Sequence, residues 1–107
     1  MPVLEITSKA AFDDLLKKHK HVVLQAHADW CGPCRVMSPI LDKQAEEHGS
    51  DALAFAKFNI DSVPDLATEF GISSIPAFLF FADGEKVKDV VGANPPALTK
   101  AVGEFVA

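Results

Sequence analysis

The sequence lacks an apolar run long enough to cross a membrane. The longest such run extends from Ala77 to Ala82, whereas a membrane-spanning helix needs about 20 apolar residues. The first residues, Met1 to Ala10, also lack the basic start, apolar stretch and small-residue cleavage site of a secretory signal. We therefore expect a cytoplasmic protein that makes no contact with membranes.

Positive charge is scarce as well. Nine lysines and a single arginine are outnumbered by 15 acidic residues, and the formal net charge is −5. No basic cluster is available to follow a phosphate backbone, so nucleic acid is not an expected partner. Only two cysteines are present, which is too few for a small domain held together by disulfides. With 107 residues, 49% of them apolar, the chain is expected to form one globular domain over residues 1–107.

Apolar residues follow helical and strand spacings in alternation along the chain. Strands are predicted at Val3–Ile6, Val22–His27, Leu53–Ile60, Ala77–Phe81 and Glu85–Val91, the last two joined by a hairpin turn at Asp83-Gly84. Helices are predicted after the capping residues Thr7 or Ser8, at Pro33–His48, at Pro64–Phe70 and from Pro95 onward. This order predicts an α/β fold in which about four helices flank a central mixed sheet of about five strands.

The two cysteines stand close together, in the segment Cys31-Gly32-Pro33-Cys34 between a predicted strand and a predicted helix. Cys31 is therefore expected at a helix N-terminus, where unpaired N–H groups and the helix dipole favour a thiolate. Cys34 follows one turn later on the same face, within reach of a disulfide. Such a pair can attack a foreign disulfide through Cys31 and complete the exchange through Cys34.

Other uses of the two cysteines fit less well. Zinc needs four ligands, and His48 is the only histidine that follows the pair. Covalent haem attachment needs a histidine directly after the second cysteine, where this chain has Arg35. A purely structural disulfide would close a loop too short to constrain the unfolded chain strongly. No metal site is expected, and a redox function is favoured.

The segment from Asp29 to Arg35 resembles the active site of the thioredoxin family, and its Gly32-Pro33 pair distinguishes it from those of protein disulfide isomerases and glutaredoxins. The segment Val90–Ala101 is most similar to fungal members. Further similarities extend along nearly the whole chain, at Pro39, Phe58–Asp61, Gly71-Ile72, Ile75-Pro76, Asp83-Gly84 and Val91–Ala93.

This resemblance implies a thioredoxin fold and a thiol–disulfide oxidoreductase that reduces protein disulfides. Cys31 would be the attacking cysteine and Cys34 the buried, resolving one. No bound cofactor is implied, because the dithiol stores both electrons; NADPH would be used indirectly, through a thioredoxin reductase. The expected partners are that reductase and disulfide-containing client proteins. A monomer is expected, and a weak dimer through the flat surface around Trp30 stays open.

The resemblance also implies a client-binding surface. Trp30 would flank the cysteines, with half-buried packing as its alternative role. Pro76 would be a cis-proline facing the cysteines, and Ile75 would either offer its backbone to a client segment or serve only as core. Gly92, followed by Ala93, would let the client approach closely or would simply terminate a strand.

The family pattern is broken behind the cysteines. Where the family has an aspartate, six residues before the first cysteine, this chain has Gln25, which cannot titrate. We expect slower exchange, because general-base help is typically worth about 10²–10⁴-fold, and higher stability, because a buried carboxylate costs more than an amide. Lys57 has lost its acidic partner, so it either extends its amine to water or, if buried, acts as a neutral base.

His27 stands where the family usually has an aromatic residue. It either packs with one hydrogen bond, or it bonds Asp61 or tunes the thiolate. A second function therefore stays open, a thioredoxin-fold binding or regulatory subunit with weak redox turnover. Gln25 favours this second function, whereas the intact cysteine pair and Ile75-Pro76 argue against it.

Overall fold

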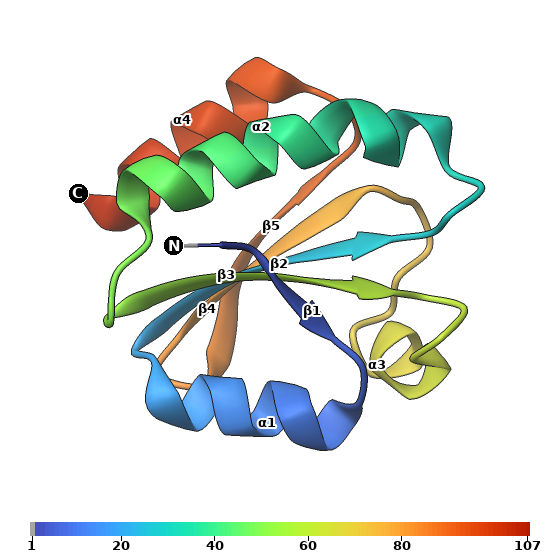
Figure 1. Ribbon diagram of the computed structural model, residues 1–107, viewed down its shortest axis with the longest axis horizontal. Coiled ribbons are helices and arrows are strands. Elements are labelled where there is room, and N and C mark those ends of the chain that lie inside the picture. The colour runs from blue at the N-terminus through green and yellow to red at the C-terminus, as the bar shows by residue number, and fades with distance from the viewer. Residues whose placement is uncertain (1) are drawn as a thin grey trace.

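The computed structural model of the chain describes residues 2–107, so that Met1, the first residue of the expected domain, lies outside it. A five-stranded sheet lies between two layers of helices (Figure 1). The strands are β1 (Leu4–Ile6), β2 (His21–His27), β3 (Leu53–Asn59), β4 (Ala77–Ala82) and β5 (Glu85–Val91). The helices are α1 (Lys9–Lys18), α2 (Gly32–His48), α3 (Pro64–Glu69) and α4 (Pro95–Val106). The predicted fold class and order of elements are confirmed.

The sheet has the strand order β1-β3-β2-β4-β5. The first three strands in this order run parallel, whereas β4 is antiparallel to β2 and β5 is antiparallel to β4. Strand β2 is thus central and covered on both faces, which explains why Val22–Ala26 is buried throughout and why its apolar residues form a continuous run.

Each face of the sheet packs against its own pair of helices. Helices α1 and α3 cover one face, and α2 and α4 cover the other (Figure 1). Phe12 of α1 and Leu66 of α3 lie in the first core with Leu24 of β2. Met37 of α2 and Leu98 of α4 lie in the second core with other strand residues. Since successive strand residues point to opposite faces, one central strand contributes to both cores.

Helix α2 begins where strand β2 ends, after a short connection. Cys31 is its N-cap residue and Pro33 lies in its first turn, a position where proline loses no hydrogen bond. At the other end, the N–H of Gly49 donates to the carbonyl of Ala45 at 2.8 Å. The cysteines therefore stand at the carboxyl end of the central strand, next to the connection between α3 and β4 (Figure 1).

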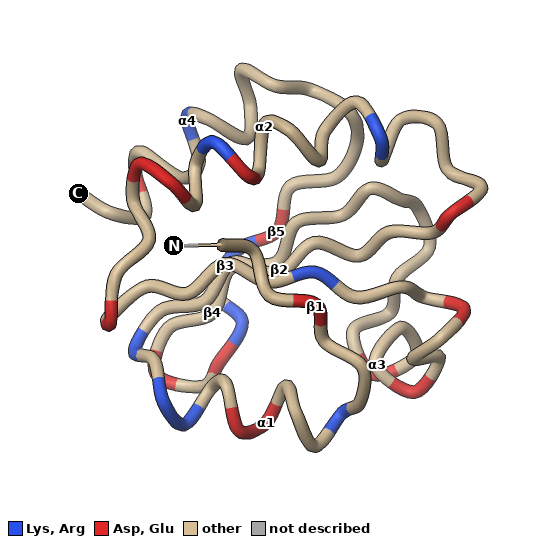
Figure 2. Tube along the Cα trace, viewed as in Figure 1, with Lys and Arg blue, Asp and Glu red and all other residues tan. Residues whose placement is uncertain are grey.

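Charged residues are spread over the chain, with acidic and basic positions interspersed along α1 and α2 (Figure 2). Helix α2 is the longest of the helices, and it carries both signs of charge. Within residues 2–107, no helix has the length and apolar character that a bilayer crossing requires.

Candidate redox site

Cys31 and Cys34 form a disulfide at the N-terminus of α2, with their Cα atoms 5.3 Å apart. Both residues are buried, at 4% and 2% exposure. The sulfur of Cys31 accepts a hydrogen bond from the N–H of Cys34 at 3.1 Å. This bond and the dipole of a 17-residue helix both favour negative charge on the Cys31 sulfur.

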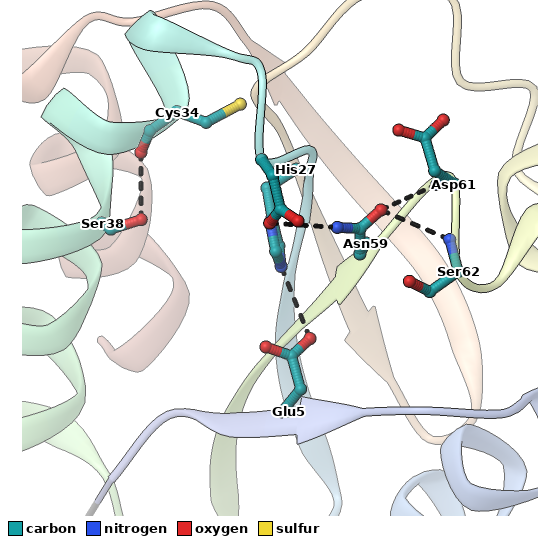
Figure 3. Close-up of polar contacts among 8 residues, drawn as sticks. Glu5, His27, Cys34, Ser38, Asn59, Asp61 and Ser62 are labelled. Carbon is teal, nitrogen blue, oxygen red and sulfur yellow. Dashed lines mark hydrogen bonds and ion pairs between the residues drawn. The ribbon is translucent and has the colours of Figure 1, made fainter.

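The loop before the disulfide presents Trp30, which is 69% exposed. Its indole N–H donates to Oδ2 of Asp61 at 2.8 Å. Asn59 fixes both sides of this contact, because its side-chain oxygen accepts the N–H of Asp61 at 2.8 Å and its amide donates to Asp29 at 3.3 Å (Figure 3). Arg35 of α2 closes the arrangement by donating to the carbonyl of Asp29 at 2.7 Å.

The support that Asn59 and Asp61 give to Trp30 was not predicted. Both residues belong to a segment that resembles the family, and Asp61 was considered only as a partner of His27. The available signal was an asparagine at a strand end with an aspartate two residues on, since asparagine side chains accept hydrogen bonds from backbone N–H groups two residues later. That signal predicts a turn but not its contact with the cysteine loop, which comes from 30 residues earlier in the chain.

A second loop approaches the disulfide from the sheet. The Ile75–Pro76 peptide bond is cis, and Ile75 packs with Ile60 against the two cysteines and Ala28. Gly92 lies behind the proline, with its N–H donating to the carbonyl of Pro76 at 2.8 Å. Gly92 has a φ of +104°, so its backbone conformation is one that side-chain-bearing residues rarely adopt. The cysteine loop, the cis-proline loop and the Gly92 turn thus meet at one end of the sheet.

The remaining residues predicted to shape the site differ in exposure. Gly32 and Pro33 are exposed in the first turn of α2, and Ala93 is exposed beside Gly92. Lys57 is half-buried on β3, rather than enclosed. Within residues 2–107, no group of three or more histidine, cysteine or carboxylate side chains is arranged to hold a metal ion.

Gln25 lies in the middle of β2, between Lys57 of β3 and Phe78 of β4 in the register of the sheet. It is fully buried. Neither Nε2 nor Oε1 of its amide has a hydrogen-bond partner within residues 2–107. Leaving a buried polar group unpaired typically costs about 1–3 kcal/mol, so the amide is an energetic burden at this position.

Of the alternatives for His27, the packed histidine with one hydrogen bond agrees with the structure, and the bond to Asp61 is not formed. Nε2 of His27 instead lies 3.4 Å from Oε2 of Glu5 on β1 (Figure 3), while the Asp61 carboxylate is held by Trp30. Strand register explains the difference: Glu5 pairs with Lys57, and His27 pairs with Asn59 two residues further along β3. The side chains of Glu5 and His27 therefore lie on the same face of the sheet.

A disulfide that caps a helix at the carboxyl end of a central strand, beside a cis-proline, defines a thiol–disulfide oxidoreductase. Comparison with known proteins places it more closely. Residues 3–104 match the family model described as Thioredoxin. The chain belongs to the thioredoxin family and is a protein-disulfide reductase.

The relatives agree with this assignment. Thioredoxin-2 of Pyricularia oryzae is 43% identical over 98 residues, which are 92% of this chain and 56% of that protein. The thioredoxin of Coprinus comatus is 38% identical over 102 residues, 95% of this chain and 96% of that protein. The crystal structure of Malassezia sympodialis thioredoxin is 36% identical, with a TM-score of 0.92 and coverage of 100% of this chain and 96% of that one.

One relative is a longer protein with two functions in its name. A Mycobacterium leprae protein named as a bifunctional thioredoxin reductase/thioredoxin is 38% identical over 94 residues, which are 88% of this chain and 20% of that protein. This chain thus spans about half the length of the Pyricularia relative and a fifth of the Mycobacterium one.

Proposed function

We propose that Cys31 attacks client disulfides and that Cys34 resolves the intermediate. In the reduced protein, the Cys31 thiolate attacks one sulfur of a client disulfide, and the other client sulfur leaves as a thiolate. Cys34 then loses its proton and attacks the Cys31 sulfur, which releases the second client thiolate and closes the Cys31–Cys34 disulfide. Two electrons pass to the client. The hydrogen bond from the Cys34 N–H to the Cys31 sulfur carries this assignment.

The oxidised protein would be reduced again by a thioredoxin reductase that draws its electrons from NADPH. The Mycobacterium relative, whose name joins a thioredoxin reductase to a thioredoxin, supports this kind of partner. The dithiol itself holds both electrons between the two half-reactions, so the reaction needs no bound cofactor. Disulfide-containing proteins are the clients.

The client would lie across the three loops at the end of the sheet. Trp30 offers an exposed aromatic surface on one side of the disulfide. On the other side, Ile75 would pair its backbone with an extended client segment, as in strand addition. Pro76 holds that segment in place beside the cysteines, and the absence of a side chain at Gly92, next to Ala93, leaves room for the client backbone.

Gln25 would slow the second half of the reaction. Resolution requires Cys34 to lose its proton, and a neutral amide cannot accept one. An aspartate at this position would act as a general base for that step, so we expect Gln25→Asp to accelerate resolution. Because Gln25 cannot titrate, it also favours a second function, a binding or regulatory subunit in which redox turnover is weak.

NADPH-coupled reduction of a protein disulfide, with a thioredoxin reductase supplied, separates the two functions. The unmodified protein is expected to turn over steadily, and Cys31→Ser is expected to abolish turnover. Gln25→Asp, measured alongside across pH 6–9, is expected to be faster. Negligible turnover by the unmodified protein, restored by Gln25→Asp, would instead support the binding or regulatory subunit. Equal rates for both proteins would contradict the effect assigned to Gln25.

A further inference from the structure

We propose that Asn59 is a positioning residue that fixes the indole of Trp30 beside the disulfide, and that it thereby favours protein clients over small disulfides. Asn59 lies at the end of β3 and makes contacts with Asp29 and Asp61, one on each side of the Trp30 anchorage. This role rests on the client surface proposed above, in which Trp30 contacts the client. Asn59 takes no part in bond making and acts only through Trp30.

Trp30 is held mainly by polar contacts. Its side chain is 69% exposed, so packing restrains it little. The indole N–H donates to Oδ2 of Asp61 at 2.8 Å, a length typical of charge-assisted hydrogen bonds. An indole has no other hydrogen-bonding group, so Trp30 offers a client only its apolar ring. Recognition of a client by this ring depends on where the ring lies.

Asn59 supports the carboxylate that holds the indole. Asp61 is exposed, and its backbone is fixed by the side chain of Asn59. Oδ1 of Asn59 accepts the N–H of Asp61 at 2.8 Å and the N–H of Ser62 at 3.3 Å (Figure 3). The carbonyl of Asn59 accepts the N–H of the buried Val63 at 2.9 Å. One residue thus shapes the turn that places the Asp61 carboxylate next to Trp30.

The other end of the Asn59 amide reaches the cysteine loop. Nδ2 donates to Oδ1 of Asp29 at 3.3 Å, and Asp29 directly precedes Trp30 in the chain. Arg35 donates to the carbonyl of Asp29 at 2.7 Å. Because an amide has one donor end and one acceptor end, two N–H groups on one side and a carboxylate on the other fix its orientation. Asn59 therefore links the backbone before Trp30 to the turn that carries Asp61.

The contact with Asp29 makes an amide necessary at position 59. Aspartate would accept the same two backbone N–H groups, because asparagine and aspartate form this kind of turn equally well. Its carboxylate would, however, face the carboxylate of Asp29 without a donor between them, and like charges at this distance repel. Asn59→Asp should therefore keep the turn and break only the link to the cysteine loop.

The test compares Asn59→Asp with the unmodified protein in two measurements. Trp30 is the only tryptophan and the chain has no tyrosine, so indole fluorescence reports on Trp30 alone. The fast component of its anisotropy decay in the oxidised protein should grow in amplitude. The reduced proteins are then oxidised by insulin and by bis(hydroxyethyl) disulfide. The ratio of the insulin rate to the small-disulfide rate should fall about three- to fivefold, the effect of one lost hydrogen bond and one exposed charge repulsion.

Two further variants serve as controls. Asn94→Asp makes the same chemical change at the N-cap of α4, where the side-chain oxygen accepts the N–H of Ala97 at 3.1 Å, and it should leave the anisotropy decay of Trp30 unchanged. The double variant Asp29→Asn with Asn59→Asp exchanges the carboxylate and the amide across the contact and keeps the net charge. It should restore both the anisotropy decay and the rate ratio.

Unchanged anisotropy and an unchanged rate ratio in Asn59→Asp would overturn the proposal. A double variant as impaired as Asn59→Asp would also overturn it, because the effect would then come from the charge at position 59 and not from the contact with Asp29. If the unmodified protein reacted with neither disulfide, the proposed function would fail, whereas the anisotropy decay would still decide whether Asn59 positions Trp30.

Discussion

At the scale of single residues, Gln25 lowers the stability of the fold and makes no interaction that offsets this cost. The side chain is fully buried in the central strand, and its amide makes no hydrogen bond within residues 2–107. A buried amide still costs less than a buried carboxylate, because an isolated charge is far more expensive to remove from water. The cost of burying glutamine is therefore lower than that of an aspartate, and higher than that of an apolar side chain.

These costs of burial predict opposite stability changes for two substitutions of Gln25. Gln25→Leu, which is similar in volume, should raise the free energy of unfolding by about 1–3 kcal/mol by removing the unpaired amide. Gln25→Asp should lower it, because the new carboxyl group must be buried. Denaturant unfolding of the oxidised proteins at pH 7 measures both. A destabilised Gln25→Leu protein would show that the amide is satisfied in solution.

At this scale, the sequence predicts contacts within one segment of the chain better than contacts between distant segments. The spacing of Cys31 and Cys34 predicts a disulfide because both lie in one helical turn, a local property of the chain. The partner of His27 was not predicted, because Glu5 lies 22 residues away and reaches it only through the lateral order of strands. Contacts across a parallel sheet depend on register, which local sequence patterns do not specify.

At the scale of elements, hydrophobic periodicity predicted the whole order of helices and strands. The ends were shifted by a residue in several places: α2 begins at Gly32, and β3 ends at Asn59. These ends depend on single hydrogen bonds, such as the one from the Cys34 N–H to the Cys31 sulfur. The position of β1 beside β3 was not predicted either, since it is set by long-range packing.

Gly92 lies in the turn between β5 and α4, and Gly92→Ala should change the stability of the protein and its rate with a protein client for two different reasons. A β-carbon at Gly92 would meet no atom within 4 Å, so the substitution creates no clash inside the protein. The positive φ should nevertheless cost about 1–3 kcal/mol of stability. If the client passes here, reduction of a protein disulfide should slow several-fold while reduction of a small aromatic disulfide is little changed.

The free energy of unfolding and the two reduction rates together show whether Gly92 is only a turn residue or also a site of close client approach. Loss of stability with both substrates reduced at the original rates would identify Gly92 as a turn residue only. Ala93→Gly, at the exposed neighbouring position, is a suitable control for changes in the flexibility of the turn. It should leave the rate with the small disulfide unaltered.

At the scale of the whole molecule, the residues that stabilise the fold lie apart from the residues of the redox site. The two cores lie between the sheet and its helices, whereas the cysteine loop, the cis-proline loop and the Gly92 turn gather at one end of the sheet. Helix α2 belongs to both, because its N-terminus holds the disulfide while Met37 and Leu41 anchor it in the core. Rigid packing thus presents the sulfur pair to clients at a fixed position.

Trapping of the mixed disulfide tests most directly the claim that Cys31 attacks the client and Cys34 resolves the intermediate. Reduced Cys34→Ser protein, mixed with a disulfide-containing client, should accumulate a covalent complex joined through Cys31, identified by mass spectrometry and released by dithiothreitol. Cys31→Ser should form almost none. A complex joined through Cys34 in the Cys31→Ser protein, at a comparable rate, would contradict the account.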